Sequence, residues 1–560
     1  MKSDEGQAAE RAAETKTMLG VEYRHYRTAD GGDLYVTEWG VPFLRHLFPE
    51  QWYEKEWFRK SREKLLGTSR VYRVRTKPDG ECEGKDLVVK WCRVGEDVPV
   101  DTFTLNKFIE AEFNTPYEEF SLLTEMRQRA KKGTILTHKP LAIFVPAKRL
   151  QLWQTGRSQS KIAQKKAKFR DVELDIYRQY ILVYEWIKGV ASTSEEASRA
   201  AEEDGEEGGA AFAREMLRRS ITDMWQAGFR VLDVKPEHVI VRPKAGGGLV
   251  RDREGRVRYA LVDFELLART PAYEERVKRM RRQDYLERQR DRFAEARELP
   301  GHLHGVRILG VDYIHGDCES TNGKLWVVGR DPELFDYFQP ERWRRTKRES
   351  LSDSAQVYRT TTKDEIQLVW KVSHVGERPD EEATEAHRAH GFNSPFEEVA
   401  YALELSKAGV PSTYPRAIYM LGHLSTLPPE ILDPRRYESH AALRMPGGDP
   451  VLQRTRNYIT VWGYWNGLDE DLAGCDAARK TCRGINARQA LAAGRITPEE
   501  HDALMEKVAR LLASAGFEST TPKDTHFLLT ENSAGELVRD PDGTAAVRMC
   551  NFEFLRKLGE

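Results

Sequence analysis

The sequence is poor in cysteine, has no long apolar run and carries no excess of charge of either sign. Its six cysteines are scattered without a Cys-x-x-Cys pair, which argues against a zinc site and predicts reduced thiols in a cytoplasmic protein. No segment approaches the roughly 20 apolar residues of a membrane-spanning helix, so we expect no membrane contact. With 88 basic and 89 acidic residues, the net charge of −1 argues against a generally basic nucleic-acid-binding protein.

The first residues, MKSDEGQAAERAAETK, are charged and lack the apolar core of a signal peptide. We expect residues 1–19 to form a disordered or helical extension. The whole chain has 560 residues, of which 40% are hydrophobic. That length is too great for one compact core, so two or more domains are expected.

The chain repeats itself on the scale of a domain. Four blocks recur in the same order: LVVKWCRVGE (87–96) as LVWKVSHVGE (368–377), FNTPYEEF (113–120) as FNSPFEEV (392–399), GFRVLDVKPEHVIV (228–241) as GFESTTPKDTHFLL (516–529), and GGLVRDREG (247–255) as GELVRDPDG (535–543). Such order indicates a duplication. We place the first unit at about residues 20–303 and the second at about 304–560.

Each unit shows the same coarse sequence of elements. Apolar alternation predicts strands at 71–77 and 86–94, a helix at 115–130 and a buried strand at 179–187. An amphipathic helix at 213–229 and two strands joined by a glycine-rich hairpin follow. A strand-rich lobe with one inserted helix, followed by a helical lobe, is an α+β arrangement.

Three segments fall outside the repeat. The charged stretch 276–301 favours a helix, which we interpret as a solvated linker in preference to a binding face. The basic segment 156–170 and the acidic, glycine-rich segment 193–211 are expected to be mobile surface insertions without counterparts in the second unit. The basic one could also attract an anionic partner such as RNA.

Two aspartates of the first unit have the setting that phosphoryl transfer requires. Asp263 ends a short apolar strand in LVDF, where a carboxylate can bind Mg²⁺ together with phosphate oxygens. Thirty residues upstream, Asp233 is followed by Lys235 and then by a β-run, which is the spacing of a kinase catalytic loop. In such a loop the aspartate orients the acceptor hydroxyl and takes its proton, and the lysine neutralises the transferred phosphate.

A nucleotide also needs a cation on its phosphates, and Lys90 in the strand LVVKW can supply one. Its carboxylate partner should come from the next helix. Thr115 is expected to cap that helix in a capping box with Glu118, which leaves Glu119 to pair with Lys90. The second unit repeats this pattern with Ser394, Glu397 and Glu398 opposite Lys371.

The segment LGTSRVYRV stands where a phosphate-binding loop belongs. It offers Gly67, Thr68 and Ser69, whose hydroxyls could bond phosphate oxygens, although an ordinary hairpin turn explains the same residues equally well. The phosphate-binding interpretation is favoured by the order along the chain, which runs from this loop through Lys90 and Glu119 to the two aspartates.

That order resembles the protein-kinase-like superfamily, above all its atypical members such as the aminoglycoside and choline phosphotransferases. The resemblance rests on GTSRVYRV, VVKW, the Glu119 helix, ILVYEWIKG, DVKPEH and VDFE. It implies two tandem bilobal kinase-like domains. It also implies ATP with Mg²⁺, or Mn²⁺, and an adenine site beside the hinge residues Tyr184 to Ile187, with Glu185 and Ile187 binding through their backbone.

The first unit departs from the family pattern in three ways. His238 replaces the asparagine that binds a second metal ion, and imidazole is a poor ligand for a hard cation. Because His526 repeats it in the second unit, a shared structural role carries as much weight as metal ligation. Val231 and Leu232 replace the usual His-Arg. Little chain follows Asp263, so we expect reduced C-terminal lobes without a conventional peptide groove.

The second unit departs further and is interpreted as a pseudokinase. Asp233 aligns with Thr521 and Asp263 with Asn551, while Lys523 keeps the loop lysine. Losing a general base costs about 10²- to 10⁴-fold in rate. The triplet His315-Gly316-Asp317 spells a phosphotransferase catalytic triplet, but it precedes the lysine strand, so we expect only a turn between two strands.

The sequence therefore predicts an ATP-dependent phosphotransferase whose first unit is catalytic and whose second unit supports it. The alternative is a non-catalytic tandem scaffold that binds nucleotide or other proteins. Nucleotidyl transfer on the same fold is a third hypothesis. The acceptor is left open between a small molecule and a protein, and we expect contact between the two units.

Overall fold

The computed structural model describes residues 14–65, 70–78, 80, 83–93, 112–130, 135–150, 175, 177–294, 298–344, 346–352, 355–425, 432–465, 483–532 and 534–559. These residues form two compact units. The first contains the described residues up to 150 and from 177 to Val277, with Pro300–His302; the second contains the described residues of Lys278–Leu299, those from Leu303 onwards, and Asp175. Each unit mixes helices with a large antiparallel sheet, in agreement with the expected α+β class.

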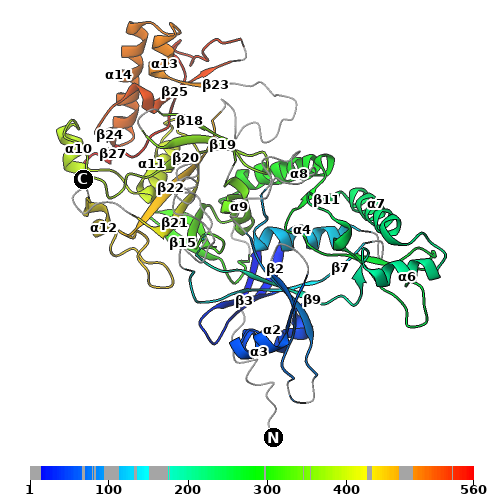
Figure 1. Ribbon diagram of the computed structural model, residues 1–560. Helices are drawn as coiled ribbons and strands as arrows, with labels where there is room; N and C mark the ends of the chain where they lie inside the picture. Colours follow the sequence, from blue (N-terminus) through cyan, green and yellow to red (C-terminus); the bar gives the residue numbers. More distant parts are fainter. Residues whose placement is uncertain are drawn as a thin grey trace. The chain divides into compact units, whose positions relative to one another are not determined.

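An eight-stranded antiparallel sheet dominates the first unit (Figure 1). In spatial order its strands are β1 (Glu14–Met18), β2 (Val21–Arg27), β3 (Asp33–Val36), β8 (Pro140–Val145), β9 (Ile181–Glu185), β6 (Asp86–Trp91), β5 (Val71–Arg75) and β4 (Arg62–Lys64). Strand β6, which carries Lys90, lies in the interior of the sheet between β5 and β9. Its lysine is therefore presented by a strand that is fixed on both sides.

Both faces of the sheet are covered, which explains the continuous apolar run of β9. Leu182 and Tyr184 belong to the core beneath helix α4 (Pro116–Arg129), whereas Ile181 and Val183 belong to a second core around Trp52. That second core lies beneath four short helices: η1 (Val41–Phe43), α2 (Leu44–Leu47), η2 (Pro49–Gln51) and α3 (Lys55–Ser61). A strand buried on both faces has no polar side, as the sequence predicted for this segment.

The remainder of the first unit is smaller. Strands β10 (Val190–Ala191), β12 (Val239–Val241), β13 (Tyr259–Leu261) and β7 (Leu136–Thr137) form one sheet, and β11 (Phe229–Val231) pairs with β14 (Leu267–Arg269). Helices α6 (Glu195–Glu203) and α7 (Gly209–Ala227) pack beside them, and η5 (Pro236–His238) precedes β12. The predicted hairpin is confirmed, because β12 and β13 pair antiparallel.

The second unit repeats the large sheet of the first strand for strand. Its eight-stranded sheet has the order β15 (His304–Ile308), β16 (Val311–Cys318), β17 (Gly323–Val328), β21 (Pro415–Leu424), β22 (Arg456–Gly463), β20 (Gln367–Val372), β19 (Val357–Thr361) and β18 (Arg348–Ser350). Lys371 lies on β20, again between two neighbouring strands. The duplication inferred from four sequence blocks thus extends to the whole sheet.

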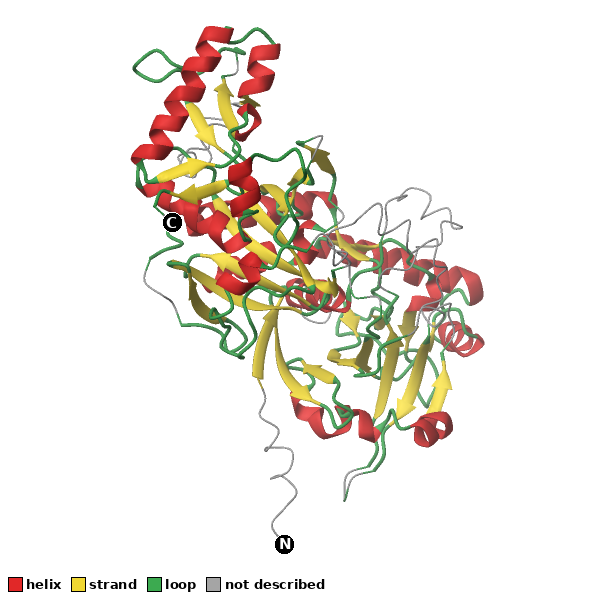
Figure 2. Cartoon of the chain, turned by 90° about the vertical axis from the view of Figure 1, so that its left-hand side faces the viewer, coloured by secondary structure: helices red, strands yellow, loops and turns green. Residues whose placement is uncertain are grey.

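Several other elements of the second unit also have matches in the first. Helix α11 (Pro395–Lys407) corresponds to α4, and the pair α13 (Ala487–Ala492) and α14 (Pro498–Ser514) to α6 and α7 (Figures 1 and 2). The smaller sheets are β23 (Arg483–Asn486), β25 (Phe527–Glu531) and β26 (Val547–Met549), and β24 (Phe517–Ser519) with β27 (Leu555–Lys557). The remaining helices are η6 (Pro332–Phe338), α9 (Pro340–Trp343), α10 (Glu385–His390), α12 (Arg435–Ser439) and η9 (Asp524–His526).

The two units match even in single hydrogen bonds. The indole of Trp52 donates to the carbonyl of Leu47 at 3.0 Å, and the indole of Trp343 donates to the carbonyl of Phe338 at 3.0 Å. Both tryptophans lie five residues after their acceptors. Pro49, Glu50 and Trp52 recur as Pro340, Glu341 and Trp343, so this short stretch repeats in sequence as well as in structure.

The triplet His315-Gly316-Asp317 lies inside strand β16 and not in the turn that we expected. His315 stacks on Trp326 of the next strand, with ring centroids 4.6 Å apart. In the first unit His25 stacks on Tyr35 in the same way at 4.8 Å. The triplet therefore belongs to the packing of the sheet, and its likeness to a catalytic loop has no structural basis.

The N-terminal extension is partly a strand, contrary to the disordered or helical state predicted for residues 1–19. Glu14–Met18 forms β1, which pairs with β2 across the whole of its length. Residues 1–13 lie outside the described part of the chain. The prediction failed because the short strand ETKTM is recognisable only through its partner.

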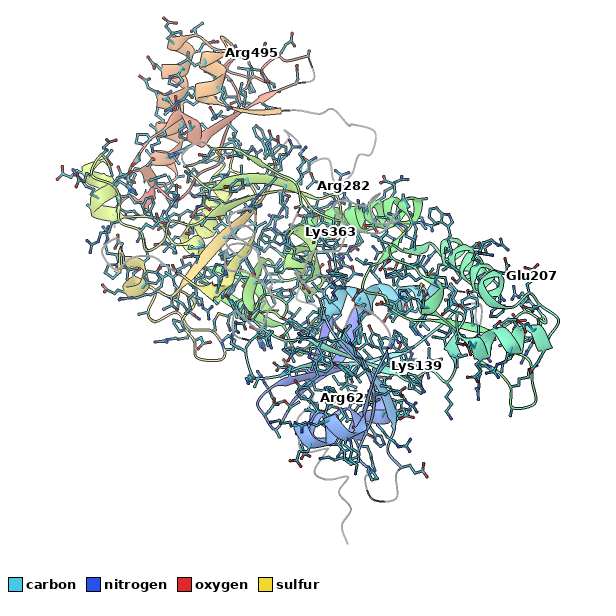
Figure 3. All side chains as sticks on the ribbon, viewed as in Figure 1. Arg62, Lys139, Glu207, Arg282, Lys363 and Arg495 are labelled. Atoms are coloured by element: carbon cyan, nitrogen blue, oxygen red, sulfur yellow. The ribbon has the colours of Figure 1, made fainter. Side chains whose placement is uncertain are left out.

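The acidic segment 193–211 is folded, and the prediction of a mobile insertion without counterpart is wrong. Ser194 caps helix α6, whose residues Ala197, Ala200 and Ala201 are buried. Asp204 then accepts a hydrogen bond from the backbone of Leu249 at 2.9 Å, which ties the segment to the glycine-rich hairpin. Glu207 is exposed beyond α6 (Figure 3). The other segment, 156–170, lies outside the described residues.

Helix α8 (Pro271–Arg290) forms where a solvated linker helix was predicted, but its arginines are not simply solvated. Arg281 pairs with Asp364 at 2.7 Å and with Asp336 at 2.7 Å, and Arg288 pairs with Asp331 at 3.0 Å. From Lys278 onwards the helix therefore belongs to the second unit. Arg282, by contrast, is exposed (Figure 3).

Candidate functional site

Lys90 is the centre of the site. Its side chain is only 4% exposed, and its Nζ lies 2.6 Å from Oδ1 of Asp263, 3.2 Å from Oε2 of Glu265 and 3.5 Å from Oε1 of Glu119. Burial opposes the charge of the ammonium group, but the three carboxylates overcome this effect and raise the pKa of Lys90 well above its usual value. Lys90 is therefore a fixed, permanently charged cation.

Glu119 reaches Lys90 because of how its helix begins. Thr115 caps α4 by accepting from the backbone of Glu118, and the Glu118 carboxylate accepts from the backbone of Thr115 at 2.9 Å. This capping box occupies Glu118, as predicted, and turns Glu119 inward to Lys90, which confirms the predicted pair. The hydroxyl of Tyr184 donates to Glu119 at 2.5 Å. Burial raises the pKa of Glu119 despite the nearby ammonium group.

Asp263 lies in the loop after β13, in an unusual backbone conformation. Its φ is +68°, a left-handed value that aspartate tolerates better than most residues. Burial alone would raise the pKa of Asp263, but the charge of Lys90 and a smaller contribution from His238 lower it to about 2. His238 Nε2 lies 3.7 Å from Oδ2 of Asp263, so both predicted metal-binding residues meet here.

Asp233 and Lys235 lie in the loop between β11 and η5. Their side chains pair at 2.9 Å and are 26% and 42% exposed. Two hydrogen bonds fix this loop: Ser192 donates to the carbonyl of Pro236 at 2.7 Å, and the amide of Val262 donates to the carbonyl of His238 at 3.1 Å. The second bond joins the loop of Asp233 to the strand that leads into Asp263.

Of the predicted hinge residues, Glu185 ends strand β9 and Ile187 follows it half-buried. The amide of Glu185 donates to the carbonyl of Lys139 at 3.0 Å, and its carboxylate pairs with the ammonium of Lys139 at 3.2 Å. Trp186 lies between Glu185 and Ile187 in the sequence. The guanidinium group of Arg73 lies over the Trp186 ring, 4.6 Å from the ring centre. The predicted phosphate-loop residues Gly67, Thr68 and Ser69 lie outside the described part of the chain.

Glu265 is the site residue that sequence reasoning missed. The Phe-Glu pair after the loop aspartate recurs in both units, and this repeat was the available signal. The backbone amide of Asn114 donates to the carbonyl of Glu265 at 3.0 Å, while its side-chain amide donates to Leu267 at 2.9 Å. Asn114 belongs to the repeated Phe-Asn-Thr/Ser-Pro block, so this block anchors the loop that presents Glu265 to Lys90.

His138 is a second residue that the sequence did not single out. It is buried between strand β9 and the loop after β13, stacked on Tyr184 with ring centroids 3.9 Å apart and touching Phe264 edge-on. Burial, together with the charge of Lys90, lowers the pKa of His138 to about 3, so its ring is neutral. It packs behind the ion cluster without adding charge to it.

The second unit builds the same cluster around Lys371. Its Nζ lies 2.6 Å from Glu553 and 3.2 Å from Glu398, as predicted for Glu398. Asn551 takes the position of Asp263 and accepts from Lys371 at 3.2 Å. His374 bonds Glu553 at 3.0 Å. The lysine and two glutamates are thus common to both units, and the loop aspartate distinguishes them.

Two residues of the second site make fewer polar contacts than their counterparts in the first. Oε1 of the buried Glu398 has no hydrogen-bond partner among the described residues, and burial raises the pKa of this carboxyl to about 7. His526, which aligns with His238, is buried and stacked on Phe554 with ring centroids 5.2 Å apart. Burial lowers the pKa of His526 to about 4. In this unit the histidine therefore has a packing role.

Within the described residues, no group of three or more histidine, cysteine or acidic side chains is arranged to hold a metal ion by itself. In the same residues no helix is long and apolar enough to cross a membrane. A metal at Asp263 would therefore need ligands besides the described histidine, cysteine and acidic side chains, such as phosphate oxygens. No protein-family model matches the sequence, and no curated protein matches it significantly.

Proposed function

We propose that the chain is an ATP-dependent phosphotransferase of the atypical kinase type, with a catalytic first unit and a second unit that is a supporting pseudokinase. One observation carries the proposal. Lys90 on β6, Glu119 on α4 and Asp263 after β13 come from three distant parts of the sequence and converge on one ammonium group. In kinases, a lysine, a helix glutamate and a loop aspartate arranged in this way bind the nucleoside triphosphate and its metal ion.

The fold is compatible with this proposal. Each unit has a strand-rich part with one helix inserted after the lysine strand, followed by a smaller part that carries the loop of Asp233 and the loop of Asp263. We extend the proposal to a bilobal kinase-like fold with a reduced C-terminal lobe. Strand β9 would then be the hinge that binds adenine, through the carbonyl of Glu185 and the backbone of Ile187. The amide of Glu185 already donates to the carbonyl of Lys139.

The residues divide the work as follows. Lys90 binds the α and β phosphates and is oriented by Glu119. Asp233 accepts the proton of the acceptor hydroxyl, and Lys235 neutralises the transferred phosphate. Asp263, ionised because of its lowered pKa, supplies the oxygen ligand that Mg²⁺ prefers, whereas His238 is a poorer ligand. A bound Mg²⁺ would neutralise charge on the triphosphate.

The test uses the full chain with Mg²⁺-ATP. We expect a rise in melting temperature for the wild type and for Asp233→Asn, and a smaller rise for Asp263→Asn. With water as the phosphoryl acceptor, release of ADP and inorganic phosphate should fall about 10²- to 10⁴-fold in Asp233→Asn. Thr521→Ala, at the matching position of the second unit, should leave ADP release unchanged. The absence of any thermal shift with Mg²⁺-ATP or Mn²⁺-ATP would refute the proposal at its first step.

A second function, a non-catalytic tandem scaffold, is favoured by two observations. Nothing among the described acidic side chains forms a metal site without outside ligands, and histidine stands at the second metal position in both units. Binding of ATP without ADP release in the wild type would favour this alternative. Mass analysis of the product separates a gain of phosphate from a gain of adenylate, the third hypothesis.

A further inference from the structure

The contacts of Lys90 raise the question of how a phosphate could reach it. An ammonium group has three N–H donors, and Lys90 has three carboxylates within 3.5 Å. A phosphate oxygen can bind only if one carboxylate withdraws. The three carboxylates differ in what they could bind instead.

Glu119 is the least able to leave, because it is 1% exposed and is bonded by Tyr184. Asp263 is 31% exposed, and its proposed role is to turn toward a metal. Glu265 is 12% exposed and has a second cation beside it: its Oε1 lies 3.5 Å from Nη1 of Arg93, while its Oε2 lies 3.2 Å from Lys90. Glu265 is therefore shared between two cations.

The guanidinium group of Arg93 is held beside Glu265. Its guanidinium group lies over the ring of Phe113, 4.2 Å from the ring centre, which fixes its plane. A guanidinium group can bind both oxygens of a carboxylate at once. A small movement of Glu265 toward Arg93 would keep its charge neutralised and free one donor of Lys90.

We propose that Glu265 is a positioning residue that neutralises Lys90 when no nucleotide is bound and passes to Arg93 when phosphates bind. This exchange rests on the proposed function and adds its regulation: Glu265 competes with the nucleotide for Lys90, and Arg93 relieves the competition. Glu265 thereby sets the affinity for nucleotide without touching it.

The second unit offers a natural comparison. His374 replaces Arg93, and Glu553 lies closer to its lysine, at 2.6 Å, with only 4% of its side chain exposed. A single imidazole cannot bind a carboxylate through two parallel hydrogen bonds. The exchange inferred for the first unit has no equivalent there, which fits a unit whose lysine is not used for phosphate.

The experiment compares full-chain variants by calorimetry with Mg²⁺ and a non-hydrolysable ATP analogue. Glu265→Gln should tighten binding about fivefold, because a neutral amide competes less well for Lys90. Arg93→Gln should weaken binding about fivefold, and Arg93→Lys should restore most of it. In the variant that carries both changes, Arg93→Gln should weaken binding less than it does alone, since Glu265 no longer competes for Lys90. Glu553→Gln is the matched control and should not change the dissociation constant.

Weaker binding in Glu265→Gln, or equal effects of Arg93→Gln with and without Glu265, would overturn the exchange. A second measurement, made without nucleotide, tests the exchange of Glu265 independently of whether the chain binds ATP. Acylation of Lys90 by an acetyl N-hydroxysuccinimide ester, measured by peptide mass spectrometry against Lys371 in the same digest, should be faster in Glu265→Gln and slower in Arg93→Gln. Equal rates in all variants would also overturn it.

Discussion

The hydroxyl of Tyr184 gives the most direct test of the electrostatics of the first site. It donates to Glu119 at 2.5 Å, and Glu119 is otherwise 3.5 Å from its lysine. In Tyr184→Phe a buried carboxylate oxygen loses its donor. Hydrogen bonds to charged groups contribute about 1.5–3 kcal/mol, so we expect a loss of about 2 kcal/mol. For a unit of this size that corresponds to a fall of roughly 4–8 °C in melting temperature.

The effect should depend on pH in a defined direction. The pKa of Glu119 is already raised above its ordinary value of 4.5 by burial, and loss of the donor raises it further. A carboxyl whose pKa is raised in the folded protein destabilises it above that pKa, and the deficit shrinks as pH falls toward 4.5. The difference between Tyr184→Phe and the wild type should therefore be largest at neutral pH and smaller near pH 5.

The assay is differential scanning calorimetry of the full chain, with Tyr23→Phe as the control. Tyr23 is fully buried in the same core, and its hydroxyl has no partner among the described residues. Removing that oxygen should leave the transition unchanged or raise it slightly. If Tyr184→Phe were no more destabilising than Tyr23→Phe, the assigned role of the hydroxyl would be wrong.

Two further changes test the fold around the sites. Thr115→Ala removes the cap of α4 and should cost about 1 kcal/mol in urea unfolding, whereas Thr115→Ser should be nearly neutral; equal losses in both would contradict the capping box. Arg281→Met removes a cation from the buried Asp364 and should cost about 2 kcal/mol, because Arg342 stays as a partner at 3.7 Å; unchanged hydrogen exchange along α8 would contradict the assigned anchoring.

The sequence predicted those parts of the site that depend on short-range rules. The capping box with Thr115 occupies Glu118, which leaves Glu119 to pair with Lys90. This prediction depends only on the first turn of one helix. The internal repeat then located the same pair, Glu398 with Lys371, in the second unit. The buried strand β9 was equally visible, because a strand covered on both faces has an unbroken apolar run.

The remaining features depend on long-range contacts. Glu265 reaches Lys90 because Asn114, far away in sequence, fixes the loop after β13. The strand β1 exists only through its pairing with β2. The arginines of α8 were visible as charges, but Asp331 and Asp364, which pair with Arg288 and Arg281, lie 43 and 83 residues away, and no local pattern identifies them. Sequence spacing cannot show which distant charges will meet.

The left-handed backbone at Asp263 separates the two units at a position where their side chains also differ. Asn551, at the matching position, does not share that conformation, although asparagine adopts it more readily than most residues. Its side chain instead accepts from the backbone of Glu553 at 3.1 Å. The two units thus differ at this position in main chain as well as in side chain. The single substitution Asn551→Asp would place a carboxylate in the second loop without the backbone conformation that directs the carboxylate of Asp263 in the first.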